Sequence, residues 1–111
     1  MAVTSKPLVT SQYAANSEST VYTAGTGTRT IIDKLTGYNV SGSAATLTVK
    51  LVPSGGTAGA SHTIMAKTIA AGDPYTFPEI VGHVLEAGGI ISLLASAANA
   101  IVVRISGRET T

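Results

Sequence analysis

The chain has 111 residues, a formal net charge of +1 and 12% charged residues, about half of the roughly 25% usual in soluble domains. This length predicts one domain with a single core. The seven Lys and Arg residues are scattered, which argues against the clustered positive charge that nucleic-acid binding requires. The lack of cysteine excludes disulfides, thiol chemistry and thiolate metal sites.

The first thirteen residues are predicted to be an N-terminal lead-in, followed by a single domain over residues 14–111. Residues 1–6 show no regular pattern, whereas residues 7–13 are compatible with an edge strand, where a proline is tolerated. The chain begins without the charged region and long apolar core of a signal peptide. The most apolar stretch, residues 90–105, is shorter than the roughly 20 residues of a membrane helix. We therefore expect a soluble chain with no membrane partner.

The clearest strand pattern lies in residues 30–53, which are predicted to form a β-hairpin about a turn at residues 41–44. In the second arm, apolar and polar side chains alternate, so the two kinds lie on opposite faces. The apolar set is Leu47, Val49 and Leu51. In the first arm the alternation breaks at residues 33–34. This break predicts a β-bulge that lets Ile32 and Leu35 both point inward.

Further strands are predicted around this hairpin, with turns about every ten residues. They cover residues 20–23, 61–69, 74–77, 90–94 and 100–108. In the last of them, Ile101, Val103 and Ile105 are expected to face inward. Residues 79–85 are the best candidate for a helical or 3-10 turn, because apolar residues recur there at spacings of three and four. The predicted fold class is all-β: a jelly-roll-like antiparallel sandwich of about seven or eight strands with at most one short helical turn.

The residues with reactive side chains do not form a recognisable site. His62 and His83 lie far apart, and a metal site without cysteine would need several acids beside them. The acids fall in separate predicted elements, so no catalytic carboxylate pair can be assigned. The serines lack the G-x-S-x-G turn of hydrolases, and the glycines lack the phosphate-loop spacing. We therefore expect no enzyme, no cofactor and no metal.

A set of strand-and-turn phrases runs from about residue 20 to residue 110. They are LVPSGG at 51–56, IAAG at 69–72, YTFPE at 75–79, VLEAG at 84–88 and ISGRE at 105–109. Together they resemble small virion structural proteins of tailed bacteriophages and prophages. The resemblance implies a particle component without enzymatic activity and does not specify its place on the particle.

From this resemblance we expect a capsid decoration (cement) protein on the virion surface, made in the cytoplasm of the host bacterium. Its expected partners are other copies of itself, as a homodimer or homotrimer, and the major capsid protein. Low charge suits this role, because few ions must be desolvated when faces meet, and repeated copies add avidity. The expected interface residues are Tyr38, Val52 and Val102, all placed on outward-facing positions.

Two alternatives stay open. A tail, baseplate or fibre-attachment component would use the same kind of sandwich against a different partner. A carbohydrate-binding β-sandwich module is the alternative from another class of protein. The absence of Trp and the low aromatic content of 5% count against it, because sugar recognition commonly uses flat aromatic rings.

Overall fold

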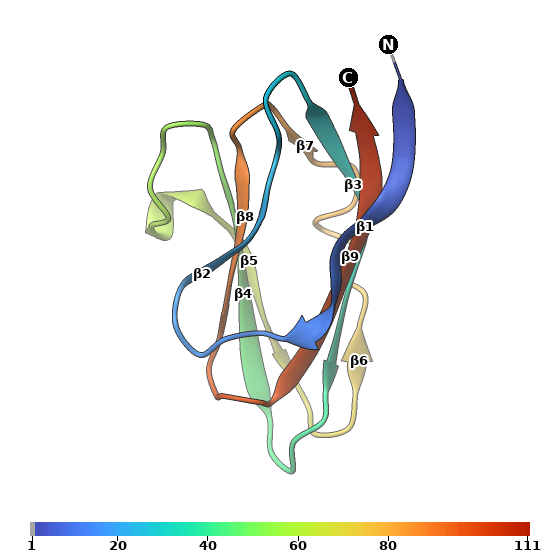
Figure 1. The fold of residues 1–111 in the computed structure, drawn as a ribbon. Coiled ribbons are helices and arrows are strands. Elements are labelled where there is room, and N and C mark those ends of the chain that lie inside the picture. Colours follow the sequence, from blue (N-terminus) through green and yellow to red (C-terminus); the bar gives the residue numbers. More distant parts are fainter. Residues whose placement is uncertain (1) are drawn as a thin grey trace.

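A computed structural model describes residues 2–111, which build two antiparallel β-sheets packed face to face (Figure 1). Sheet A has the order β1 (Val3–Tyr13), β9 (Ile101–Thr110), β3 (Arg29–Asn39) and β6 (Pro74–Tyr75), with β7 (Val84–Leu85) also paired to β3. Sheet B has the order β2 (Ser19–Thr23), β8 (Ile90–Ala95), β4 (Ala45–Val52) and β5 (Thr63–Ile69). The helix content of the described residues is one 3-10 turn, η1 (Ala60–His62).

The strand pairing is that of a jelly roll. β1 pairs with β9, β2 with β8, β3 with β6 and β7, and β4 with β5. The first and second halves of the chain therefore run antiparallel along one another like a long ribbon, and successive pairs fall alternately in sheet A and sheet B. This arrangement confirms the predicted all-β, jelly-roll-like sandwich.

The predicted hairpin over residues 30–53 is wrong, because its two arms lie in different sheets. β3 pairs with β9, while β4 pairs with β5 and β8. Both arms are strands with one apolar face, as predicted, but such faces can share a core by packing across a sandwich instead of pairing side by side. Asn39 holds the crossing in place, since its buried Nδ2 donates to the backbone oxygens of Ser43 at 2.9 Å and Ile69 at 2.8 Å.

The predicted β-bulge in β3 is confirmed. The register between β3 and β9 shifts between Ile32 and Lys34. Because of this shift, Ile32 and Leu35 are both fully buried although they are three residues apart. Close to the bulge, a Cβ on Gly107 of β9 would lie only 2.3 Å from the backbone oxygen of Ile31. The tight approach of β3 and β9 therefore requires a glycine at position 107.

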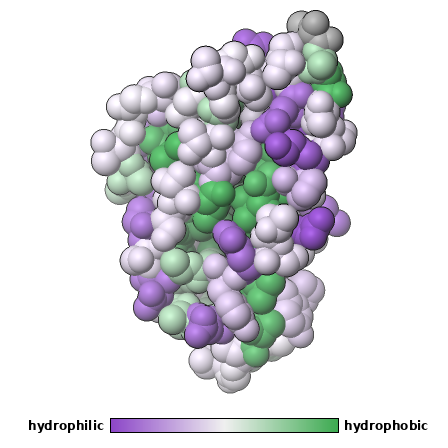
Figure 2. Space-filling view, viewed as in Figure 1, coloured by the Kyte–Doolittle hydropathy of each residue, from purple (hydrophilic) through white to green (hydrophobic). Residues whose placement is uncertain are grey.

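The core lies between the sheets and is mainly aliphatic. Ile101, Val103 and Ile105 are completely buried, as predicted, and Phe77 is the largest fully buried side chain. A Cβ on Gly37 would lie 3.1 Å from the Phe77 ring, so this glycine makes room for the ring. On the side of the sandwich shown in Figure 2, hydrophobic side chains reach the surface between two more polar margins.

Residues 79–85 do not form the predicted helical turn. They make tight turns instead, with hydrogen bonds from the Ile80 N–H to the Phe77 oxygen and from the His83 N–H to the Ile80 oxygen, and then enter β7. The apolar spacing was misleading because only Ile80 and Leu85 are buried there, while Val81 and Val84 are exposed.

The N-terminal segment is part of the sandwich. Residues 3–6, expected to belong to a loose lead-in, pair with the end of β9, where Val3 lies opposite Thr110. β1 is an edge strand of sheet A and contains Pro7. Its register with β9 shifts on either side of Val9. In residues 2–111 no helix has the length and apolar character needed to cross a membrane.

Candidate interaction surface

A row of exposed apolar and aromatic side chains crosses the outer face of sheet A. Tyr13 of β1 and Tyr38 of β3 both lie directly opposite Val102 of β9. Directly paired residues point to the same face of a sheet, so the three side chains stand side by side. Tyr13 and Tyr38 are 52% and 42% exposed, and Val102 is partly exposed. We call these three residues the tyrosine row.

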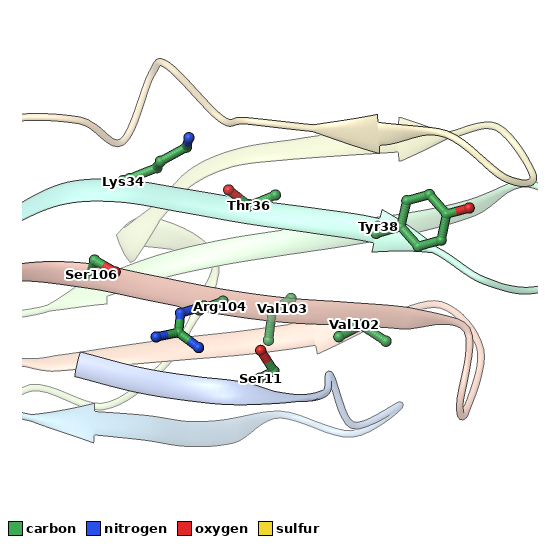
Figure 3. Close-up of a pocket in the computed structure, with 8 residues that line it drawn as sticks. All are labelled: Ser11, Lys34, Thr36, Tyr38, Val102, Val103, Arg104 and Ser106. Atoms are coloured by element: carbon green, nitrogen blue, oxygen red, sulfur yellow. The ribbon is translucent and has the colours of Figure 1, made fainter. Parts of the chain in front are cut away.

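A shallow groove of about 440 Å³ adjoins the tyrosine row (Figure 3). β1 contributes Ser11 to its lining, in the part of the strand where the register with β9 shifts. β3 and β9 contribute Lys34, Thr36, Tyr38, Val102, Val103, Arg104 and Ser106. The groove therefore combines apolar surface, hydroxyl groups and two cations on three neighbouring strands.

The two cations of the groove differ from the other Lys and Arg side chains. Four of the others form ion pairs: Lys6 with Glu109, Arg29 with Glu86, Lys50 with Glu18 and Arg108 with Asp33. Lys67 Nζ lies 4.8 Å from the centre of the Tyr75 ring. Within residues 2–111, Lys34 and Arg104 form no ion pair. The groove therefore holds two positive charges that the rest of the described chain leaves uncompensated.

Another ion pair marks the far end of the same face. Arg108 donates to the Asp33 carboxylate through Nε and Nη2, at distances of 2.9 to 3.2 Å. The hydrogen bonds and the negative charge of Asp33 raise the pKa of Arg108. Both groups are exposed, so the pair contributes little to stability. The charges of Arg108 and Asp33 nevertheless compensate one another at this end of the face.

The outer face of sheet B is occupied by polar groups that bind one another. The buried Ser92 hydroxyl donates to Glu18 Oε2 at 2.5 Å, and Lys50 also donates to the Glu18 carboxylate. Burial raises the pKa of Glu18, but the hydrogen bonds from Lys50 and Ser92 outweigh it and hold the pKa below its ordinary value. The hydroxyls of Thr46 and Thr68 are 2.9 Å apart. These polar side chains of the outer face of sheet B therefore find their hydrogen-bond partners within the chain.

A third network joins β2 to sheet A near the chain ends. The Tyr22 hydroxyl donates to the Glu109 carboxylate and lies 2.8 Å from the Thr30 hydroxyl. Lys6 Nζ lies 3.4 Å from the Glu109 carboxylate. The hydrogen bond from Tyr22 lowers the pKa of Glu109, burial opposes it, and Lys6 adds to the lowering. Burial and the bond to Glu109 raise the pKa of Tyr22. Because β2 belongs to sheet B, and Thr30, Glu109 and Lys6 belong to sheet A, these contacts link the two sheets.

A smaller hollow of about 230 Å³ lies on the edge of the sandwich. It is lined in part by Ile64 of β5 and Val84 of β7, which are 39% and 48% exposed, and by His83. His62 lies in η1, and no group of three or more His, Asp or Glu side chains in the described part of the chain is placed to hold a metal ion.

The structure brings together two of the three expected interface residues. Tyr38 and Val102 are direct register partners on the exposed face of sheet A. The outward placement of Val52 is wrong, because this residue is only 1% exposed. The alternation that buries Leu47 and Val49 ends before the strand does, so Val52 also turns inward while Leu51 is only partly buried. Any interface role of Tyr38 and Val102 stays a prediction.

Tyr13 is the member of the tyrosine row that the sequence did not single out. A signal was present, since Tyr13 is an aromatic residue that follows the polar pair Ser11 and Gln12 in an expected edge strand. Its place beside Val102 depends on the pairing of two strands almost ninety residues apart, which no local pattern reveals.

No family model matches this chain, and no curated protein matches it. Among solved structures, it is similar to a chain from Bacillus endospore appendages, which are described as a novel family of disulfide-linked pili. The TM-score is 0.57 at 14% sequence identity, and the match covers 98% of this chain and 88% of the other. At this identity the likeness shows a shared fold.

Proposed function

We propose that this chain is a non-enzymatic structural protein of a bacteriophage virion: a capsid decoration (cement) protein that forms homo-oligomers and binds the outer capsid shell. The resemblance of its strand-and-turn phrases to tailed-phage virion proteins gives the class. The observation that carries the proposal is the tyrosine row with its adjoining groove on the outer face of sheet A. Tyrosine is enriched at protein interfaces, where it supplies large contact area at low entropic cost.

Sheet A presents this surface in a preformed state. The three strands under the tyrosine row are paired to one another, and their inward side chains are part of the core. Little conformational entropy is therefore lost when a partner binds. Three half-exposed side chains cover far less than the roughly 800 Å² per partner of a stable interface, so a single contact is weak. Oligomerisation belongs to the proposal because linked copies bind by avidity.

The likeness to a chain of endospore appendages described as disulfide-linked pili supports an assembling role, because a chain of similar fold takes part in an assembly. The two cases differ in how the copies are held. The pili are described as disulfide-linked, whereas these 111 residues contain no cysteine. Assembly of this chain is therefore proposed to depend on noncovalent contacts.

The test is electron microscopy of purified phage particles with this protein present and with its gene deleted. We expect regularly spaced density on the outside of the shell that disappears in the deletion. Density lost only from the tail or baseplate would instead support a tail, baseplate or fibre-attachment role for the same surface. Identical particles, together with a monomeric purified protein, would refute a virion role.

A carbohydrate-binding module is the second candidate, and the same two tyrosines favour it. Tyr13 and Tyr38 are separated by one strand, which corresponds to about 10 Å between their backbones. Two rings at such a spacing on a flat sheet can stack on neighbouring sugar units. A glycan array tests this candidate: selective binding that disappears in Tyr38→Ala would support it, and an array without signal would remove it.

A further inference from the structure

Within residues 2–111, the two Lys and Arg side chains that have neither a carboxylate partner nor an aromatic ring beneath them share one groove. Of seven Lys and Arg residues, four have carboxylate partners and Lys67 lies over an aromatic ring. The other two, Lys34 and Arg104, both line the groove beside the tyrosine row. The chain has few charges and pairs most of them. The two cations of the groove lie together at the surface where a partner is proposed to bind.

The register fixes how these two cations are arranged. Arg104 lies opposite Thr36, and Lys34 lies opposite Ser106, so the two cations are diagonal neighbours on adjacent strands. Diagonal side chains on an antiparallel pair begin about 7–8 Å apart. Figure 3 shows them extending from different strands, Lys34 from β3 and Arg104 from β9. Two anionic groups on one extended segment can therefore meet both cations at once.

We propose that the groove binds a carboxylate-bearing protein segment of the assembly partner. In this arrangement Asp or Glu side chains of the segment pair with Lys34 and Arg104, while an apolar side chain contacts Val102 and Tyr38. The hydroxyls of the groove, including those of Ser11 and Thr36, can donate further hydrogen bonds to the carboxylates. This inference rests on the proposed function and specifies the chemistry of its partner.

The segment is assigned to a different chain because this one has few carboxylates to offer. Glu18, Asp33, Glu86 and Glu109 are held in ion pairs, and Glu79 accepts a hydrogen bond from the Tyr75 hydroxyl at 2.9 Å. Among residues 2–111, Asp73 is the one acid without such a contact, and a single carboxylate cannot pair with both Lys34 and Arg104, so a second copy would have to break other contacts to fill the groove. The carboxylates are therefore expected on the shell protein, while contacts between copies use other surfaces.

A protein segment also fits the groove better than a nucleic acid. Phosphate binding depends on many Lys and Arg residues acting together, and this groove offers two beside an apolar row. The net charge of the chain is only +1. A segment that combines carboxylates with an apolar side chain matches both parts of the surface.

The test uses phage particles that lack this protein, to which the purified protein is added back and then sedimented with the particles. Lys34→Gln/Arg104→Gln is compared with wild type and with Arg29→Gln/Lys67→Gln, which removes the same charge outside the groove. We expect about tenfold weaker binding for the groove variant at low salt, and near wild-type binding for the control. Added NaCl should weaken particle binding by wild type more than binding by the groove variant, because salt screens ion pairs of Lys34 and Arg104 that the variant cannot form.

The outcomes separate this inference from the proposed function. If wild type does not bind the particles, both fail. If wild type binds and the groove variant binds equally well at every salt concentration, the carboxylate partner is wrong and the decoration role stands. Light scattering and a fluorescein-labelled single-stranded oligonucleotide complete the test. An oligomer lost only in the groove variant would assign the groove to a second copy, and oligonucleotide binding lost only in that variant would assign it to nucleic acid.

Discussion

The outer faces of the two sheets differ in whether their polar and charged side chains have partners within the chain. On sheet B, Ser92, Glu18 and Lys50 bind one another, and the hydroxyls of Thr46 and Thr68 form a cross-strand pair. On sheet A, the tyrosine row is exposed and the two cations of the groove have no ion-pair partner within residues 2–111. A face whose polar groups are satisfied internally is suited to water, whereas an open face gains free energy by meeting a partner.

A charge placed in the tyrosine row should have the largest effect on particle binding. Val102→Glu is expected to weaken particle binding about a hundredfold, because the new carboxylate would be buried against a carboxylate-bearing partner. The matched control is Thr48→Glu on the outer face of sheet B, which should bind like wild type. Sedimentation with particles measures the binding, and circular dichroism checks that both variants fold. Equal losses in the two variants would show that the two faces do not differ in function.

The network on sheet B should matter for stability instead of binding. Glu18→Gln removes the negative charge beside Lys50, whose side chain is only 11% exposed, and is expected to lower the free energy of unfolding by about 1–3 kcal/mol. Glu86→Gln is the control, since its ion pair with Arg29 is exposed and should contribute little. Urea unfolding compares the two. A Glu18→Gln variant as stable as Glu86→Gln would mean that the network does not stabilise sheet B.

Acid should weaken the contacts of Glu18 with sheet B and the contact of Glu109 with Tyr22 of β2. The pKa values of Glu18 and Glu109 are lowered in the fold from an ordinary value of 4.5. A lowered folded pKa means that the unfolded chain takes up protons first, so the stabilisation is complete above about pH 4.5 and is lost as the pH falls through the folded values. Urea unfolding between pH 3 and pH 7 measures this slope, which should be shallower in Glu18→Gln. An identical slope in the variant would contradict a role of Glu18.

The cross-strand hydroxyl pair of sheet B should show the smallest effect. Thr46→Val keeps the shape and removes one hydroxyl, which is expected to cost about 0.5 kcal/mol because such cross-strand pairs are weak and exposed. Particle binding should not change. A measurable loss of binding in this variant would place part of the interface on sheet B and contradict the assignment of the interface to sheet A.

Local patterns in the sequence were enough to predict most of the strands and several details within them, but not the start of β1 at Val3 or the short strand β7. The break in alternation at residues 33–34 predicted the bulge that buries Ile32 and Leu35, because side-chain direction follows from spacing along one strand. The pairing of the strands could not be predicted in the same way. The same half-buried β3 satisfies its apolar face whether its neighbour is β4 or β9, so the alternation did not reveal that β3 and β4 lie in different sheets.

The candidate site was predictable in part for the same reason. The outward positions of Tyr38 and Val102 follow from alternation within their own strands, whereas the place of Tyr13 beside them depends on register between distant strands. The outward placement of Val52 was wrong because a period of two need not continue to the last residue of a strand. The ion pairs that single out Lys34 and Arg104 join residues distant in sequence, so only the folded chain reveals them.

The central claim is that sheet A faces the partner and sheet B faces water. Because the sequence has no cysteine, a single introduced thiol reports on one position. Ser11→Cys lies in the groove and Thr68→Cys lies on sheet B, and both positions are exposed in the isolated chain. Maleimide labelling of each variant, free and bound to particles, predicts strong protection of position 11 and none of position 68. Protection of position 68 with position 11 left open would contradict the claim.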